Sequence, residues 1–324
     1  MHLIEEKYAP MPNKLPKKFI DSAKKCELSA ILKQGANASH LYVESNKTIS
    51  LKKIYGLEIS HQDSKEAVKI KLVVKKGVKI EKPILFCFGI LGKTGEQKIL
   101  SEIKLEEGAE AKIISHCAFP QAQDVLHEME AEIKLEKNSK LIYEDSHYHG
   151  EDYGANVVPH FKIFIGQGAF LKNELILNKG SIGKLEIIFE ANLEENALCE
   201  VVSKIIGKGK GDDIEVFDKI LLLGENSRSL TKFRGAIANQ GKMFFKGVTE
   251  ASAKGARGHI DCSEIIIGKA LAESVPIIKV SHPEARITHE ASIGKVNQKE
   301  LETLMTRGLS EKEAIDFIVK GRIK

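Results

Sequence analysis

The sequence predicts a mainly β protein, a right-handed parallel β-helix (a solenoid) with short helical segments at its N- and C-termini. Three observations predict it: a turn motif that recurs about every 30 residues, alternating apolar residues on both sides of that motif, and two helix-capping patterns near the C-terminus. A unit of this length buries its apolar face only by stacking on its neighbours, which is the property that defines a solenoid.

The turn motif is an aliphatic residue, two mostly polar residues, a Gly or Asn, and a small residue. Its Gly/Asn positions are separated by 30, 30, 28 and 30 residues and are Gly108, Asn138, Gly168, Asn196 and Asn226. Gly and Asn tolerate positive φ, so each position predicts a tight turn. A second set of corners is expected inside the units, at Gly180, Gly209, Gly241 and Ala270.

Alternating apolar residues flank these turns at strand spacing, as Ile103 and Leu105 do before the first turn and Ala111 and Ile113 do after it. Each unit therefore holds at least two short strands. A β-sandwich is the competing fold, because regular strand–turn spacing suits it too. The recurrence of one turn motif in the same form favours the solenoid.

Three segments are expected along the chain: a partly helical N-terminal segment over 1–60, a β-helix core over 61–280, and a helical segment over 281–324. No useful window between 65 and 280 keeps a 3.6-residue period free of glycine. In the first segment, helix is expected at about 19–32 and strands from about Ser39.

Two short helices are predicted at the C-terminus, because Asn297 and Ser310 are each followed three residues later by Glu, as in a capping box. Gly308 and Gly321 stand where helix-ending glycines belong. The apolar stripes of these helices are candidate partner-docking residues: Leu301, Leu304, Met305, Phe317 and Ile318. A DNA-reading helix-turn-helix is the weaker interpretation of this pair, because its charges nearly balance.

Charge and composition exclude several classes of protein. The net charge of +4 falls within residues 1–60, which hold ten Lys and six acidic residues, so the repetitive body is neutral and no nucleic-acid partner is expected. The longest apolar runs are about six residues, and acids stand near the N-terminus where a signal peptide would be basic, so neither a membrane span nor export is expected. Five scattered cysteines without a CxxC indicate reduced thiols and a cytoplasmic location.

Cys262 is the foremost candidate for chemistry, because His259 and Asp261 precede it and His289 follows 27 residues later, close to one repeat. A thiolate near imidazole or cationic groups has a lowered pKa and becomes a metal ligand or sulfur acceptor. The alternative is a small buried apolar residue, which is how most free cysteines behave.

Cys117 is the second candidate, because it lies 30 residues before His147 and so can stack on the same face as His147 and His149. These three side chains would form a ligand set, or else the two histidines are exposed loop residues. Cys87, in an apolar run, is expected in the core. A carbohydrate-active β-helical enzyme is a rival function, with Asp212 and Asp213 as its closest pair of carboxylates.

The C-terminal segment resembles the signature of the SufB/SufD family, in which a His-Glu-Ala stretch precedes a helix and the pattern MxRG(L/I)SxxEA. Here His289-Glu-Ala is followed by Met305-Thr-Arg-Gly-Leu-Ser-Glu-Lys-Glu-Ala314. Upstream, His259-Ile-Asp-Cys262-Ser-Glu-Ile-Ile-Ile-Gly is similar to the strand with the family's cluster-assembly cysteine, and His116-Cys117-Ala-Phe-Pro is similar to the stretch around its second important cysteine. The resemblance covers roughly 65–324.

The resemblance implies a scaffold for iron–sulfur cluster assembly rather than an enzyme, with ATPase activity in a SufC-type ABC ATPase that binds the C-terminal helices. It implies a homodimer in which a transient iron–sulfur cluster is held by Cys262, Glu290 and His289. Persulfide, supplied by a cysteine desulfurase or another sulfur donor, would arrive on Cys117 and pass through the β-helix to Cys262. A purely structural SufD-like partner is the alternative within the family.

The chain departs from the SufB pattern in its shorter N-terminal part and in lacking the clustered N-terminal cysteines of some SufB proteins. Sulfur delivery and any dependence on a reduced flavin stay open for that reason.

Overall fold

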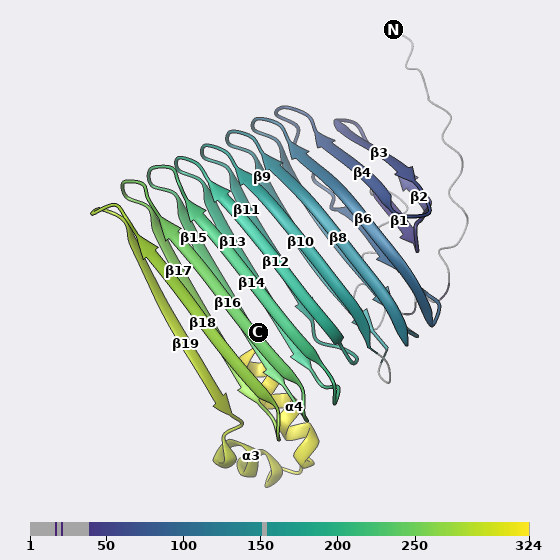
Figure 1. Cartoon of the computed structure of the whole chain (residues 1–324), viewed down its shortest axis with the longest axis vertical. Coiled ribbons are helices and arrows are strands. Elements are labelled where there is room, and N and C mark those ends of the chain that lie inside the picture. The colour runs from purple at the N-terminus through teal and green to yellow at the C-terminus, as the bar shows by residue number, and fades with distance from the viewer. Residues whose placement is uncertain (1–16, 18–20, 22–38, 151–153, 324) are drawn as a thin grey trace.

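A computed structural model shows the architecture of the chain and describes residues 17, 21, 39–150 and 154–323. These residues form a parallel β-solenoid of about eight turns whose strands stack side by side along one axis (Figure 1). The predicted fold class is thereby confirmed. The helix expected at about 19–32 lies outside the described residues apart from Asp21, and the strands expected from about Ser39 begin at His40.

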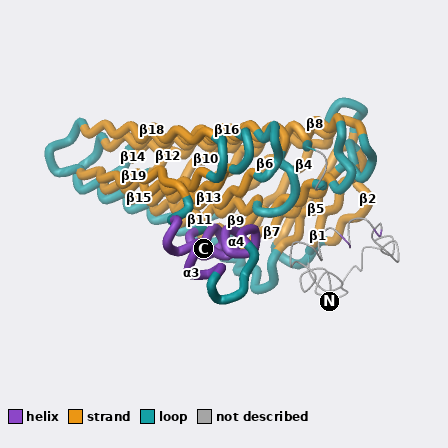
Figure 2. Tube along the Cα trace, turned by 90° about the horizontal axis from the view of Figure 1, so that it is seen from below, coloured by secondary structure: helices purple, strands orange, loops and turns teal. Residues whose placement is uncertain are grey.

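Two sheets face each other across the interior (Figure 2), and strands alternate between them along the chain. The ten-stranded sheet contains, in spatial order, β19 (Arg286–Lys295), β17 (Arg257–Ile266), β15 (Arg228–Ile237), β13 (Leu198–Gly207), β11 (Phe170–Leu177), β9 (Lys140–His149), β7 (Glu110–Phe119), β5 (Ile84–Gly89), β1 (His40–Glu44) and β2 (Lys47–Lys52).

The nine-stranded sheet contains, in spatial order, β18 (Leu271–Val280), β16 (Lys242–Ala251), β14 (Asp213–Leu222), β12 (Gly183–Leu193), β10 (Ala155–Ile165), β8 (Asp124–Leu135), β6 (Thr94–Leu105), β4 (Val68–Val74) and β3 (Leu57–Asp63). Only the pairs β1–β2 and β3–β4 are antiparallel among the described strands, and both stand at the N-terminal end of the stack.

The repeat of about 30 residues sets the register of the stack. Cys117 pairs with His147, for example, and Phe233 pairs with Cys262. All five predicted Gly/Asn turn positions have positive φ: Gly108 (67°), Asn138 (56°), Gly168 (65°), Asn196 (57°) and Asn226 (57°). Because these corners repeat, residues one repeat apart point to the same face, and the inward-pointing ones form columns that run along the interior.

The second set of corners is confirmed in part. Gly180 has a φ of +86°, but the left-handed residues of the later corners are Asn239 and Gly268, two positions before the expected Gly241 and Ala270. Gly209 does not have a positive φ. It is instead a close-approach position, because a Cβ there would lie 2.3 Å from the carboxylate of Asp212.

Two helices follow the last strand, α3 (Gln298–Met305) and α4 (Glu311–Arg322). Ser310 forms both hydrogen bonds of a capping box with Glu313, and the side chain of Asn297 accepts a bond from the backbone N–H of Glu300. Gly308 ends the first helix region with a φ of +95°. The helix end expected at Gly321 is wrong, because α4 continues through Gly321 to Arg322.

Tertiary packing explains this longer helix. Val319 and Ile323 of the C-terminal turn pack on Ile206, Ala236 and Ile265, which lie at the ends of β13, β15 and β17 on the outer face of the ten-stranded sheet. This burial outweighs the cost of about 1 kcal/mol for a glycine within a helix. In the described part of the chain, no helix has the length and apolar character needed to cross a lipid bilayer.

Candidate functional site

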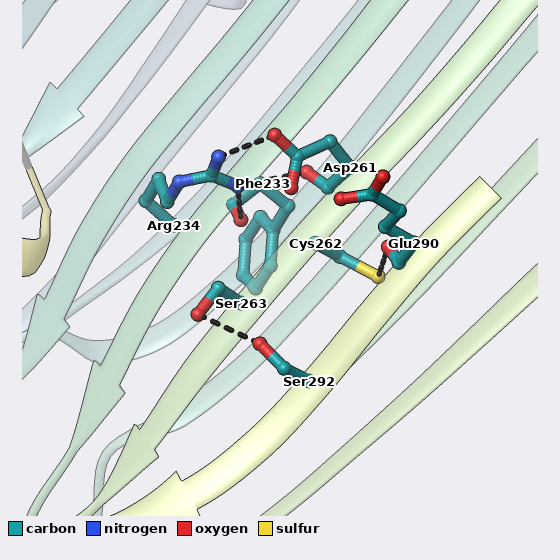
Figure 3. Close-up of polar contacts among 7 residues, drawn as sticks. All are labelled: Phe233, Arg234, Asp261, Cys262, Ser263, Glu290 and Ser292. Atoms are coloured by element: carbon teal, nitrogen blue, oxygen red, sulfur yellow. Dashed lines mark hydrogen bonds and ion pairs between the residues drawn. The ribbon is translucent and has the colours of Figure 1, made fainter.

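Cys262 lies near the middle of β17 with its side chain directed into the solenoid, and the residue is 1% exposed. Its S–H donates to the backbone carbonyl oxygen of Glu290 on β19, 3.4 Å away (Figure 3). The hydroxyl of Ser274 on β18 donates to the sulfur from the opposite sheet, at 3.1 Å. The thiol is therefore held between the last two strands of the solenoid.

Glu264 shares the inward face of β17 with Cys262, because alternate residues of a strand point the same way. Burial raises the pKa of this carboxyl to about 7. Sequence reasoning missed Glu264 and Ser274. The signal for Glu264 was the alternation Gly258, Ile260, Cys262, Glu264, which places a carboxyl in a row that is otherwise apolar or thiol.

His289 and Glu290 both lie on β19, and the strand turns them to opposite faces. His289 is in register with inward-facing Ile260, whereas Glu290 is in register with outward-facing Asp261. Both are exposed. The structure thus brings the backbone of Glu290 to the sulfur of Cys262, and places the His289 side chain one strand away on the same face as that sulfur.

The outer face of β17 carries an ion pair beside this site. Arg234 of β15 donates to the carboxylate of Asp261 with 2.9 Å between Nη1 and Oδ1, and the same nitrogen donates to the Asp261 carbonyl at 3.0 Å (Figure 3). Both side chains are only partly exposed, so the pair is better shielded from solvent than an ordinary surface salt bridge. It joins β15 to β17 next to Cys262.

The expected lowering of the Cys262 pKa is wrong. Burial raises the pKa of this thiol, and the negative charges of Glu264 and Asp261 add to the effect, whereas the Ser274 hydroxyl and Arg234 oppose it. His259 does not help, because it faces outward and its Nδ1 lies 2.8 Å from the hydroxyl of Thr288. In this single chain, Cys262 is a protonated thiol.

The C-terminal end of the solenoid is open among the described residues. Ile278 and Val280 of β18 are in register with Thr249 and Ala251 of β16, which are fully buried, yet Ile278 is 40% exposed. Ile293 of β19 is likewise exposed, although its partner in β17 is the buried Glu264. These inward-facing residues lack the next turn that would cover them.

A second buried polar cluster surrounds Cys117 near the other end of the solenoid. Single ligand atoms of Cys117, Asp145 and His147 all lie within 4.8 Å of one another. The sulfur of Cys117 is 3.9 Å from Nε2 of His127 on the opposite sheet, and His147 Nε2 is 3.1 Å from Asp145 Oδ2. Cys117 and His147 therefore stack as predicted, and the interpretation of His147 and His149 as exposed loop residues is wrong.

Burial sets the protonation of this cluster. It raises the pKa of the Cys117 thiol well above its usual value and lowers the pKa of His127 and of His149 to about 3, with the charge of His147 adding to the lowering. Burial also acts to raise the pKa of Asp145, but the charge and hydrogen bond of His147 outweigh it and hold that pKa below its usual value. The cluster thus combines the neutral imidazoles of His127 and His149, a thiol, and the Asp145 carboxylate that pairs with His147.

The interior between the two cysteines is partly polar. A small cavity is lined by Asp145, Asn173, Ser203 and Asp218 among apolar neighbours. Phe233 and Phe245 stack between this cavity and Cys262, with ring centroids 4.5 Å apart and planes within 5°. Phe233 is in register with Cys262 and Phe245 with Ser274, so the stacked pair fills the turn before the Cys262 site.

The remaining sequence candidates have other positions. Asp212 is buried and accepts hydrogen bonds from the backbone N–H groups of Ile182, Gly183 and Gly209 and from the Ser181 hydroxyl, so it fastens two corners together. This role leaves the carbohydrate-enzyme interpretation without its pair of carboxylates. Cys87 is buried, as expected, and Cys199 is also buried. Cys26 lies outside the described residues.

The predicted docking residues divide into two groups. Leu301 and Ile318 are buried and pack together with Leu304 between α3 and α4. Met305 and Phe317 are exposed, Phe317 by 63%. A groove between the two helices is lined by residues that include Leu304 and Phe317.

Comparison with known proteins places this arrangement in a class of assembly proteins. The family profile described as "SUF system FeS cluster assembly, SufBD core domain" matches residues 96–322. An iron–sulfur cluster assembly SufBD family protein of Methanocaldococcus jannaschii is 39% identical over 283 residues, covering 87% of this chain and 89% of that protein. One of Pyrococcus horikoshii is 34% identical over 294 residues, covering 89% and 87%.

The chain therefore belongs to the SufBD family of iron–sulfur cluster assembly proteins. The profile spans the solenoid from β6 through α4, and so includes the two cysteine sites and the open end.

Proposed function

We propose that this chain is the scaffold subunit on which a nascent iron–sulfur cluster is assembled, at a site that Cys262, His289 and Glu290 form where two copies meet. The observation that carries the proposal is the position of Cys262, one strand from the open end with its sulfur bonded to the backbone of Glu290. Thiolate, imidazole and carboxylate are side chains that bind iron, and the cluster is cargo that leaves.

The homodimer part of this proposal is supported by the open end. Exposed inward-facing aliphatic residues on β18 and β19 and the unpaired edges of both strands are what another layer of strands would cover. A second copy that meets this end in a two-fold arrangement would supply that layer. It would also bring a second Cys262, His289 and Glu290 to the same junction.

The C-terminal helices support the second part of the proposal, an ATPase partner. We assign the groove between α3 and α4, with the exposed Phe317 and Met305, to an ABC-type ATPase, in line with the resemblance of this segment to the SufB/SufD signature. The scaffold would then have no ATPase activity of its own. Because α4 packs on Ile265, three residues beyond Cys262, a displacement of α4 by the ATPase would reach the strand that carries the thiol.

Such a displacement of α4 would provide the movement that the buried Cys262 thiol needs in order to bind iron. A protonated thiol that is 1% exposed is a poor ligand, so cluster assembly requires that the junction opens. Sulfur from a cysteine desulfurase or another donor would then reach Cys262. Delivery from Cys117 through the interior would in addition require the stacked Phe233 and Phe245 to separate.

A structural, SufD-like subunit is the second candidate function, and the same burial of Cys262 favours it. In that role the open end would still pair with another chain and α3 and α4 would still bind the ATPase. The difference lies in whether Cys262 contributes to the cluster.

Anaerobic reconstitution with iron and sulfide, in the presence of the ATPase and ATP, separates the two functions. For a scaffold, Cys262→Ser abolishes the brown absorbance and the bound iron, whereas Cys199→Ser, at a buried cysteine of β13, leaves both unchanged. Equal cluster content in the Cys262→Ser and wild-type complexes would rule out the scaffold function and leave the structural one.

A further inference from the structure

The buried cluster around Cys117 has the composition and spacing of a metal site. Cys117 and His147 are in-register neighbours on β7 and β9, and Asp145 lies two residues before His147 on the same inward face. Ligand atoms of these three residues lie within 4.8 Å of one another, and the Cys117 sulfur is 3.9 Å from His127 Nε2. Two ligands bound at about 2.0–2.3 Å to one tetrahedral ion are about 3.3–3.8 Å apart, so binding an ion would shorten the longest of these separations by at most about 1.5 Å.

Unsatisfied polar atoms support the same interpretation. Asp145 Oδ1, His127 Nδ1 and His149 Nε2 are buried and have no hydrogen-bond partner among the described residues. Buried polar atoms are nearly always paired, and several unpaired ones in one cluster call for a ligand, an ion or a water. A buried carboxylate oxygen without a hydrogen bond, beside a thiol sulfur and imidazole nitrogens, is a donor set that suits a metal cation.

We propose that Cys117, Asp145, His147 and His127 bind one divalent ion of borderline softness, Zn²⁺ or Fe²⁺, inside the solenoid. Thiolate and imidazole select such ions over Mg²⁺ and Ca²⁺, which prefer oxygen ligands. On binding, the Cys117 thiol loses its proton to solvent, and His147 binds as a neutral imidazole, with any second ring proton also released to solvent. The Asp145 carboxylate exchanges its hydrogen bond with His147 for the ion. No oxidation or reduction takes place.

This site is distinct from the proposed cluster-assembly site and does not depend on it. Its ligands come from β7, β8 and β9, whereas Cys262 lies on β17 beyond the stacked Phe233 and Phe245. All four ligand side chains are nearly or fully buried, so exchange of the ion with solvent is slow in the folded chain. The ion would hold the two sheets together near the N-terminal end of the solenoid.

The test uses the full chain carrying Cys262→Ser, so that no cluster at the open end contributes metal. This chain is produced in medium with Zn²⁺ or Co²⁺, purified anaerobically and held in EDTA without denaturant. We expect one metal per chain to remain. The Co²⁺ form should show a thiolate-to-cobalt charge-transfer band and the visible bands of tetrahedral Co²⁺.

Adding Cys117→Ser or Asp145→Asn should lower metal affinity at least about 100-fold, since even outer-shell changes cost 10–100-fold, and Cys117→Ser should also remove the charge-transfer band. Cys199→Ser is the matched control, at a buried cysteine with no part in the cluster, and should change neither. If the added variants do not fold, X-ray absorption spectroscopy of the Zn²⁺ form of the parent chain identifies the ligands instead. We expect one sulfur ligand together with nitrogen and oxygen ligands. A parent chain without EDTA-resistant metal, or a charge-transfer band that survives Cys117→Ser, would overturn the proposal.

Discussion

The Oγ of Ser274 lies 3.1 Å from the Sγ of Cys262 and donates a hydrogen bond to it. The two residues belong to opposite sheets, on β18 and β17, so this bond crosses the interior in the last turn of the solenoid. A hydrogen bond to sulfur favours the thiolate, so Ser274 opposes the effect of burial on the Cys262 pKa by direct contact, and the charge of Arg234 adds to that opposition.

Replacing Ser274 by Ala should therefore raise the pKa of Cys262. A single hydrogen bond of about 1 kcal/mol corresponds to about a fivefold loss of thiolate, so alkylation of Cys262 at pH 8 should slow by that factor. The pH midpoint of alkylation, followed by mass spectrometry, should move upward. Ser263→Ala is the control, because Ser263 bonds to Ser292 on the outer face. An unchanged midpoint for Ser274→Ala would contradict the assigned role.

Glu264→Gln should change how stability depends on pH. Burial raises the pKa of Glu264 to about 7, so the folded chain holds this proton more tightly than the unfolded chain does. The free energy of unfolding of the wild type should then fall, relative to the variant, as pH rises from about 4.5 to about 7, by up to about 3 kcal/mol. Above that window the difference should be constant.

Urea denaturation at several pH values measures this difference. Asp218→Asn should behave in the same sense, since burial also raises the pKa of Asp218 to about 7. Glu290→Gln, at an exposed position, serves as the control. Parallel pH profiles for wild type and Glu264→Gln would show that Glu264 is not held protonated in the folded chain.

Asp212→Ala should destabilise the chain without affecting the chemistry of either cysteine. The Asp212 carboxylate accepts bonds from three backbone N–H groups and one hydroxyl at two corners, and their loss leaves buried donors unpaired. A loss of about 2–4 kcal/mol in the free energy of unfolding is expected. Asp213→Ala, at the neighbouring position, should cost less than about 0.5 kcal/mol. Similar denaturation curves for both variants would refute the fastening role.

Phe317→Ala and Ile318→Ala should separate partner binding from stability. Phe317 is 63% exposed beside the groove, whereas Ile318 is buried between the two helices. Phe317→Ala should lower co-purification of the ATPase at least about tenfold with an unchanged melting temperature. Ile318→Ala should cost about 2–4 kcal/mol of stability. Normal ATPase capture by Phe317→Ala would remove this groove from the proposed interface.

The sequence predicted the structure correctly where the conformational preference of a residue and the 30-residue repeat indicated the same feature. Five Gly/Asn positions at regular spacing predicted five left-handed corners, and the register between Cys117 and His147 followed from one 30-residue step. Strand alternation places His259 and Asp261 on the face of β17 opposite to Cys262, and this alternation is readable from the sequence. The wrong prediction of a low pKa came from treating neighbours in sequence as neighbours in space.

The sequence did not predict which residues of the two sheets contact each other across the interior. Whether Ser274 meets Cys262, or His127 meets Cys117, depends on the length and path of corners that offset one sheet against the other. The end of α4 depended on tertiary contact in the same way, since Val319 and Ile323 pack on the solenoid and extend the helix past Gly321.

Ile278→Asp tests most directly whether the cluster forms where two open ends meet. Ile278 is exposed in the single chain, so a charge there should leave the fold intact, but it would be buried in the proposed dimer. We predict that this variant is a folded monomer by light scattering and binds no iron–sulfur cluster on anaerobic reconstitution with the ATPase and ATP. Leu223→Asp, at an exposed site in the corner just after β14, should remain a dimer with full cluster content. A monomeric Ile278→Asp chain that still assembles a wild-type amount of cluster would contradict the account.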